Sequence, residues 1–169
     1  MSEVFVISDT HFGHKNILKF PSSYIEGEKL RPFKSLTEMN VTIIENWNKV
    51  VSVKDKVYHL GDVAWDLASL KLVGLLNGKK RLVRGNHDLL SLASYREFFH
   101  DIYGVRQING IWLTHCPMYL GEDVDKSKVK INLHGHLHDR IIPNKKYKNV
   151  CVECINYTPI SLDEIIKEL

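Results

Sequence analysis

Five short motifs rich in His and Asp divide this sequence, and each of them directly follows a short run of β-branched and aliphatic residues. In chain order the motifs are Asp9-Thr10-His11, Gly61-Asp62, Gly85-Asn86-His87-Asp88, Thr114-His115-Cys116-Pro117 and Gly135-His136-Leu137-His138. Apolar runs of this length, bounded by turn residues, are typical of buried strands. We therefore expect five buried strands, each of which ends in a polar loop that carries chemistry-bearing side chains.

Helix-length amphipathic patterns alternate with these runs, which predicts an α/β fold. The clearest helix begins after a capping box of Ser35 and Glu38, and its apolar positions recur every three or four residues from Leu36 to Val51. Further helices are expected over residues 67–76, 92–99 and 161–169, the last with Leu162, Ile165, Ile166 and Leu169 on one face. Strands are expected over residues 4–7, 57–60, 81–83, 110–113, 131–133 and 150–155, with the first at the centre of the sheet.

Length and composition predict one domain over residues 1–169, because 44% hydrophobic residues can form a complete core in a chain of this size. The formal charge of +3 is too small to indicate nucleic-acid binding by itself. We expect no membrane association, because we find no apolar stretch that could span a bilayer, and an acid stands near the start where a signal peptide carries positive charge. A cytoplasmic protein is therefore expected.

Three cysteines, an odd number, favour reduced thiols over a disulfide framework. Cys151 and Cys154 have the spacing of a metal or redox pair. They lie in a strand-like run, however, where residues three apart face opposite sides of a sheet. We interpret them as two small strand residues.

Paired ligands stand at both ends of the motif series. Asp9 and His11 are two residues apart in the extended chain that leaves the first strand, so both side chains point to one side and can chelate one ion. His136 and His138 repeat this geometry. Each pair predicts part of a metal site.

The intervening motifs complete a two-metal set. Two divalent cations need a bridging carboxylate to remain roughly 3.5–4 Å apart, and Asp62 suits that bridge. Asn86 adds a carboxamide oxygen and His115 an imidazole. This mixed O/N set without thiolate favours Mn, our first expectation, or Fe, Zn, Ni or Co, over a structural zinc site built on cysteine.

The five motifs in this order resemble the calcineurin-like metallophosphoesterase superfamily, and the resemblance extends from Asp9 to His138. The stretches 9–17 and 156–165 look more narrowly like its small phage and bacterial members. The resemblance implies two stacked mixed β-sheets flanked by helices, without a cap domain, and a site at the carboxyl ends of the central strands. It also implies two ligand sets: Asp9, His11, Asp62 and His138 for the first ion, and Asp62, Asn86, His115 and His136 for the second.

The same resemblance implies hydrolysis by in-line attack of a hydroxide that bridges the two ions. His87 would protonate the leaving oxygen, and Asp88 would orient His87. The family's Ser/Thr phosphatases carry a phosphate-holding arginine after Gly-Asp, whereas Gly61-Asp62 here continues as Val-Ala-Trp-Asp. We therefore expect a phosphodiester substrate, such as a nucleotide, cyclic nucleotide or nucleic-acid end. A phosphomonoesterase is the alternative, and a protein-binding scaffold with an impaired metal site is a third hypothesis; no protein partner can be inferred.

Other candidates have a structural and a functional interpretation. His14 is either a surface side chain or a contact to substrate phosphate, and Arg84 either contacts phosphate or pairs with an acid. We expect Asp66 to cap a helix and His134 to pack beneath the site, and we set aside His59 and His100. The loop from Phe12 to Lys34 is rich in basic and aromatic residues, so it is either ordinary loop packing or a platform, including Phe20 and Tyr24, that stacks a base.

Overall fold

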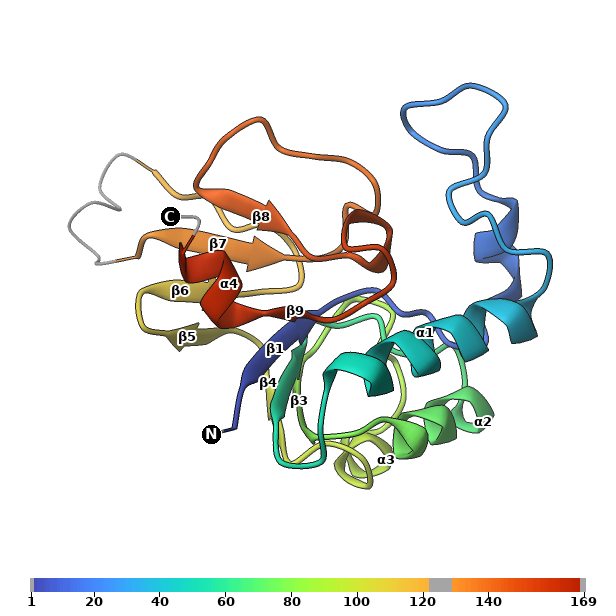
Figure 1. Cartoon of the computed structure of the whole chain (residues 1–169), viewed down its shortest axis with the longest axis horizontal. Coiled ribbons are helices and arrows are strands. Elements are labelled where there is room, and N and C mark those ends of the chain that lie inside the picture. Colours follow the sequence, from blue (N-terminus) through green and yellow to red (C-terminus); the bar gives the residue numbers. More distant parts are fainter. Residues whose placement is uncertain (1, 122–128, 168–169) are drawn as a thin grey trace.

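The computed structural model describes residues 2–121 and 129–167 and arranges them as two packed β-sheets with helices beside them (Figure 1). The first sheet has the order β4-β3-β2-β1-β9, with β1 Val4–Ile7, β2 Lys56–His59, β3 Lys79–Val83, β4 Asp101–Tyr103 and β9 Ile160–Ser161. The second has the order β5-β6-β7-β8, with β5 Arg106–Ile108, β6 Ile111–Leu113, β7 Ile131–His134 and β8 Tyr147–Asn149. In each sheet one strand, β9 or β5, is antiparallel and the others are parallel. The predicted pair of mixed sheets is confirmed, and the described residues form no cap domain.

Successive side chains of the strands point to opposite faces of the sheet and fill two hydrophobic cores. In β1, Phe5 and Ile7 face one cluster, which also contains residues of α1 (Leu36–Val50), α2 (Leu67–Leu70) and α3 (Leu92–Arg96). Val6, between them, belongs to a second cluster that joins the two sheets and includes Leu113 and Leu133. Because successive residues of a strand point to opposite faces, this apolar run explains why β1 is buried between helices and the second sheet.

Helix α1 is confirmed with its predicted start. Ser35 Oγ accepts a hydrogen bond from Glu38 N at 3.1 Å, whereas the Glu38 carboxylate accepts one from Lys34 N at 2.7 Å. The reciprocal half of the capping box is therefore displaced by one residue. The helix buries Met39, Ile43 and Trp47.

Several elements differ from the sequence prediction. The expected helix over residues 67–76 is one α-helical turn followed by the 3₁₀ helix η2, Lys71–Leu75, which contains Gly74, a weak helix former. A second 3₁₀ helix, η1 (Lys15–Lys19), lies in the long loop after β1. Strand β2, not β1, is the middle strand of the first sheet. Strands β4, β5, β8 and β9 were not predicted, because two or three residues carry too short a pattern.

The predicted strand over residues 150–155 is wrong. Strand β8 ends at Asn149, and the chain then turns into the 3₁₀ helix η4, Val152–Cys154. The apolar run is buried from several sides where the two sheets meet, so it needs no strand alternation. In α4 (Leu162–Lys167), Leu162 and Ile165 are buried as expected but Ile166 is 41% exposed; Leu169 lies outside the described residues.

The two sheets converge at the carboxyl ends of their parallel strands. Ser8, just after β1, forms a parallel bridge with Cys151, and Ser8 N donates a hydrogen bond to Val150 O at 2.9 Å. This junction brings the loops after β1, β2 and β3 beside those after β6 and β7. No helix in the described part of the chain is long and apolar enough to cross a membrane.

Candidate metal centre

All seven predicted ligands lie on the loops that follow β1, β2, β3, β6 and β7. Two of these loops touch through glycines: a Cβ on Gly61 would lie 2.5 Å from Gly85 N, and one on Gly85 would lie 2.6 Å from Asp62 N. Gly61 also has a φ of +100°, a conformation that side chains disfavour. The glycines of these motifs therefore permit a backbone approach that places the two loops together.

Asp62 lies at the middle of the cluster. Its Oδ2 is 3.6 Å from His11 Nε2 and 3.5 Å from His115 Nε2. His11 Nε2 also lies 3.7 Å from Asp9 Oδ1, and His115 Nε2 lies 2.8 Å from Asn86 Oδ1. One carboxylate thus stands between two imidazoles that belong to different predicted ligand sets.

The remaining two predicted ligands flank this row. The ring centroids of His11 and His138 are 5.3 Å apart, and those of His115 and His136 are 5.1 Å apart. The structure therefore brings the seven residues into one continuous cluster.

Unpaired polar atoms test whether this cluster suits cations. Asp9 is fully buried and His11 is 3% exposed, yet Asp9 Oδ1 and His11 Nε2 have no hydrogen-bond partner within the described chain. A buried polar atom without a partner costs about 1–3 kcal/mol. The ligand atoms of Asp9, His11 and His138 lie within 4.8 Å of one another, as do those of Asp9, Asp62 and His115. The residues present therefore fit bound divalent metal ions.

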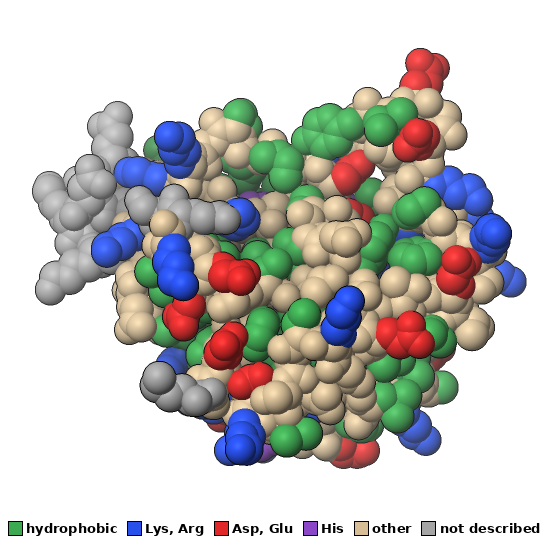
Figure 2. Space-filling view, viewed as in Figure 1, with side chains coloured by type: hydrophobic (Ala, Val, Ile, Leu, Met, Phe, Trp, Pro, Cys, Tyr) green, Lys and Arg blue, Asp and Glu red, His purple; other side chains and the backbone are tan. Residues whose placement is uncertain are grey.

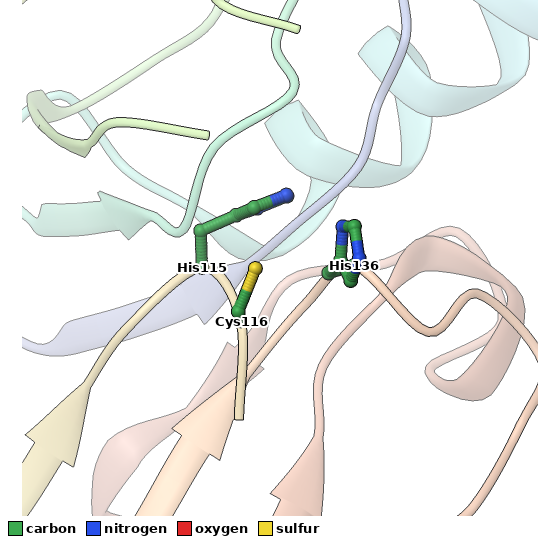
Figure 3. Close-up of side chains that lie close together, drawn as sticks. All are labelled: His115, Cys116 and His136. Carbon is green, nitrogen blue, oxygen red and sulfur yellow. The ribbon is translucent and has the colours of Figure 1, made fainter. Parts of the chain in front are cut away.

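A third group contains a residue that the sequence analysis missed. Cys116 Sγ lies within 4.8 Å of the ligand nitrogens of His115 and His136, and Figure 3 shows the three side chains pointing to the same side of the strand ends. Partial burial, and then the charges of Asp62 and Asp9, raise the pKa of this thiol. A thiol thus stands beside a set that we expected to contain only oxygen and nitrogen.

Two of the imidazoles, those of His115 and His138, are oriented by hydrogen bonds at Nδ1. His115 Nδ1 lies 2.8 Å from Leu60 O, and His138 Nδ1 lies 3.0 Å from Glu153 Oε1. Such bonds fix the tautomer and direct Nε2 toward a metal. Burial lowers the pKa of His138, but the hydrogen bond and charge of Glu153 outweigh it and raise the pKa overall.

Glu153 in turn pairs with a buried arginine. Arg31 is fully buried, and its Nε and Nη2 both lie 2.7 Å from Glu153 Oε1. The same guanidinium donates to Thr10 O at 2.9 Å and to Asp9 O at 2.6 Å. Burial raises the pKa of Glu153, but Arg31 and His138 bring it below its usual value of 4.5. This pair therefore connects the backbone of one predicted ligand to the imidazole of another.

The sequence analysis missed this connection. Arg31 was counted among the basic residues of the loop from Phe12 to Lys34, and Glu153 was placed in a strand. The one available signal was a single acid in the otherwise apolar run 150–155.

Backbone strain coincides with the cluster. The φ angles are positive at Asp9 (59°), His11 (49°), Asp62 (55°), His136 (67°) and His138 (52°). Each such residue costs roughly 1–3 kcal/mol and persists only where its surroundings hold it. Five of the seven predicted ligands are therefore held in a left-handed backbone conformation that residues other than glycine rarely adopt.

His87 lies at the exposed rim of the cluster. Its backbone N–H donates to Asp62 Oδ1 at 2.8 Å, and its ring centroid is 5.7 Å from that of His11. The side chain is thus close to the predicted ligands and open to solvent.

Asp88 does not orient His87 as predicted. Its carboxylate accepts hydrogen bonds from the backbone N–H groups of Asp62, Val63 and Gly85 at 2.8–2.9 Å. Tyr95 O–H, at 3.3 Å, is a further donor. Burial raises the pKa of Asp88 even though the backbone bonds oppose it. Asp88 therefore ties together the two loops that carry Asp62 and Asn86.

His14 and Trp65 form an aromatic wall beside the cluster. The two rings stack with centroids 4.0 Å apart and an interplanar angle of 8°. His14 is 8% exposed, and its burial lowers its pKa to about 4, so the imidazole is neutral near pH 7. Trp65, which the sequence analysis did not select, is 51% exposed and has its centroid 6.0 Å from that of His87.

Arg84 is bonded to the main chain and not to an acid. Its Nε donates to Asp88 O at 2.8 Å and its Nη2 to Leu90 O at 3.2 Å. Because both bonds go to main-chain carbonyls, the guanidinium holds the loop after β3 instead of pairing with an acid, and its contact with substrate phosphate stays a prediction.

The residues for which we expected a structural role make contacts that fit such a role. Asp66 caps α2 by accepting a hydrogen bond from Ser69 N at 2.7 Å. His134 is fully buried under the cluster, with Nδ1 2.9 Å from Gly135 O, and buried His59 lies 2.9 Å from Thr10 Oγ1. His100 is exposed.

Cys151 and Cys154 are free thiols, but their strand interpretation was wrong. Cys151 Sγ donates to Asp9 Oδ2 at 3.2 Å, and Cys154 Sγ donates to His138 O at 3.1 Å. They therefore support the loops of two predicted ligands.

Comparisons with known proteins agree with this architecture. The profile of the family described as calcineurin-like phosphoesterase matches residues 3–161. An uncharacterized protein of Methanocaldococcus jannaschii is 38% identical over 185 residues, covering 99% of this chain and 91% of that protein. The Gene 66 protein of Mycobacterium phage L5 is 24% identical, covering 84% of this chain and 80% of the phage protein. A crystal structure of a protein of unknown function from Aquifex aeolicus covers all of both chains at 29% identity, with a TM-score of 0.75.

Proposed function

The chain belongs to the calcineurin-like phosphoesterase family, and from this premise we propose that it hydrolyses phosphodiesters with two divalent metal ions, Mn²⁺ foremost. The first ion is assigned to Asp9, His11, Asp62 and His138, and the second to Asp62, Asn86, His115 and His136. The observation that carries the proposal is the position of the Asp62 carboxylate, 3.6 Å from His11 Nε2 and 3.5 Å from His115 Nε2. A carboxylate between two such sites is what a dinuclear centre needs.

When bound, two such ions supply an activated water near neutral pH and offset charge on the phosphoryl oxygens. The protein residues have separate tasks. His87, exposed at the rim, is assigned to donate a proton to the leaving oxygen. Asp88 keeps the loops of Asp62 and Asn86 together through its backbone hydrogen bonds. Neutral His14 is assigned to contact the substrate phosphate by hydrogen bonding.

A diester is preferred over a monoester because two nearby guanidinium groups are already engaged. Arg31 binds Glu153 and main-chain carbonyls, and Arg84 binds two main-chain carbonyls. Most of their donors are therefore occupied, which leaves few of them for the second charge of a phosphate monoester. On the face shown in Figure 2, basic and acidic side chains are interspersed, so that face offers no continuous basic track for a nucleic-acid backbone. This face therefore gives no support for a long polymer over a nucleotide-sized diester.

The test combines metal analysis with assays on bis-p-nitrophenyl phosphate and p-nitrophenyl phosphate. We expect close to two metal ions per chain and faster hydrolysis of the diester. Asp62→Asn is expected to abolish turnover and to lower occupancy of both sites, because a neutral bridge loses the charge that both ions share. A variant with near-wild-type activity at saturating Mn²⁺ would contradict the bridging assignment.

The alternatives predict different results. A phosphomonoesterase would hydrolyse the monoester faster, and a protein-binding scaffold would hydrolyse neither ester even when loaded with metal. We favour an enzyme because all seven ligand positions and His87 are present. The three free cysteines support our proposal of a reducing, cytoplasmic location.

A further inference from the structure

A cavity of about 380 Å³ adjoins the metal centre. It is named here the arm pocket, and its lining includes Phe20, Leu30, His136, Leu137, His138 and Arg140. Its size lies in the range of small-molecule sites, which is roughly 300–1,000 Å³. Because His136 and His138 are also predicted metal ligands, a molecule whose phosphate is held at the metals can extend directly into this space.

One wall of the arm pocket is a hairpin formed by residues 20–30, which projects at the upper right of Figure 1. Pro21 and Lys29 form an antiparallel bridge, and Leu30 N donates to Phe20 O at 2.8 Å. Next to the hairpin, Arg31 is fully buried. The base of this wall is therefore fixed to the protein core.

The hairpin is also attached to the loop after β7, which forms the opposite wall. The Asp139 carboxylate accepts hydrogen bonds from Ser22 Oγ at 3.1 Å and Ser23 N at 2.7 Å. Arg140 Nε donates to Ser23 Oγ at 3.2 Å, and Ile141 N donates to Tyr24 Oη at 2.8 Å. The arm pocket is thus preformed, and ligand binding need not order it.

Phe20 gives the pocket an aromatic surface. The side chain is 42% exposed, and its ring is held against His14 in a T-shaped contact with centroids 5.9 Å apart. By contrast, Phe12 is fully buried in the core, and the Tyr24 hydroxyl is bonded to the loop after β7. Of the loop aromatics Phe12, Phe20, Tyr24 and Phe33, Phe20 is the one that lines the cavity.

We propose that the arm pocket binds the nucleobase of a nucleotide phosphodiester whose phosphate lies at the metal centre. This inference rests on the proposed phosphodiesterase function and specifies its substrate. A base has a flat π-face that stacks on an aromatic ring, and its edge carries acceptors for a guanidinium. Phe20 and Arg140 supply these two partners. An acyl chain would leave the remaining donors of Arg140 unused, because only Nε is bonded to Ser23 Oγ, and a sugar lacks the planar π-face that stacks flat on Phe20.

The test compares two diesters with the same leaving group, thymidine 5′-(p-nitrophenyl phosphate) and methyl p-nitrophenyl phosphate. The wild type is expected to prefer the thymidine ester, measured as the ratio of the two kcat/KM values. Phe20→Ala should lower that ratio about 5- to 150-fold, the loss that corresponds to one base–aromatic stack. Phe20→Tyr, which keeps the ring, should restore most of it. Ile25→Ala, a change of an exposed apolar residue of the same hairpin, should leave the ratio as in the wild type.

The outcomes separate the two proposals. Hydrolysis of both esters without a preference for thymidine, or an equal ratio in wild type and Phe20→Ala, overturns the nucleobase assignment and leaves the phosphodiesterase proposal intact. Binding of thymidine 5′-monophosphate, measured by calorimetry on metal-loaded protein, tests the pocket without turnover. If the protein hydrolyses neither ester but binds the nucleotide more tightly than Phe20→Ala does, the phosphodiesterase proposal fails and the pocket assignment stands. Equal binding by both overturns the pocket.

Discussion

His87 has an exposed side chain, and it is its backbone N–H, not its ring, that bonds to Asp62. A proton donor needs access to the substrate, whereas a ligand needs fixed contact with a metal. We therefore predict that His87→Gln keeps its metal content and lowers turnover of diesters with alkoxide leaving groups about 10²- to 10⁴-fold. The loss should be much smaller with p-nitrophenolate, which leaves with little need of a proton. Equal losses with both leaving groups would assign His87 another role.

Glu153 links the metal centre to a buried charge. Its change to Gln leaves Arg31 buried without a counter-charge and weakens the bond that orients His138. We predict that Glu153→Gln weakens metal binding about 10- to 100-fold, as loss of such outer partners does. In the presence of chelator, the free energy of unfolding should fall by about 3–5 kcal/mol, the cost of removing one partner of a buried pair.

Metal titration by calorimetry and urea unfolding measure these two effects. Glu45→Gln, a change of an exposed acid on α1, serves as the control. If Glu153→Gln folds and binds metal as tightly as this control, Glu153 does not position His138.

For single residues, the sequence predicted which side chains lie together in the site. An Asp, Asn or His placed just after a buried strand must emerge at the strand's carboxyl end. The sequence did not predict the residues that hold these side chains in place. Arg31 and Glu153 meet across 122 positions of the chain, and no local pattern encodes such a contact. The bonds of Arg84 and Asp88 were not predicted either, because their partners are main-chain atoms, which lie in the same loop for Arg84 and also in the loop after β2 for Asp88.

Elements were predictable where their pattern is long. Helix α1 repeats its apolar positions over 15 residues, whereas β9 has two. The run over residues 150–155 was taken for a strand because it is apolar, although burial at the junction of two sheets can also require apolar residues. Tertiary burial therefore decided the structure where the local pattern was ambiguous.

Asp55 lies in the turn between α1 and β2 and stabilises that turn by hydrogen bonds. Its carboxylate accepts hydrogen bonds from Glu3 N at 2.9 Å and Ser52 N at 2.8 Å, and these bonds lower its pKa below the usual value of 3.8. Because the pKa in the folded state is the lower one, the charged form stabilises the fold fully above pH 3.8. That stabilisation is lost as the pH falls through the folded-state pKa.

We therefore predict that Asp55→Asn lowers the melting temperature near neutral pH, because the carboxamide is uncharged and has one acceptor oxygen, whereas the carboxylate accepts the two bonds on separate oxygens. The difference from the wild type should narrow as the pH falls below 3.8. Thermal unfolding followed by circular dichroism across this range measures it. A difference that is constant with pH would show that the charge of Asp55 does not contribute.

For the whole molecule, the stability of the fold and the strain of the site oppose one another. Five predicted ligands have positive φ angles, and two buried ligand atoms lack a partner within the described chain. Two packed sheets and the layer of α1–α3 hold these loops in place. The protein without metal is therefore expected to fold, but the strain lowers its free energy of unfolding, and cation binding can raise it again.

A ligand that binds only the folded state at about 100 times its dissociation constant adds about 2.7 kcal/mol per site. For a chain of this size, that corresponds to a rise in melting temperature of roughly 5–11 °C per site. We predict such a rise when Mn²⁺ is added to chelator-treated protein, its reversal by excess chelator, and its near absence in Asp62→Asn, which lacks the shared charge. If the wild type melts at the same temperature with and without metal, no divalent ion binds this cluster in the folded state.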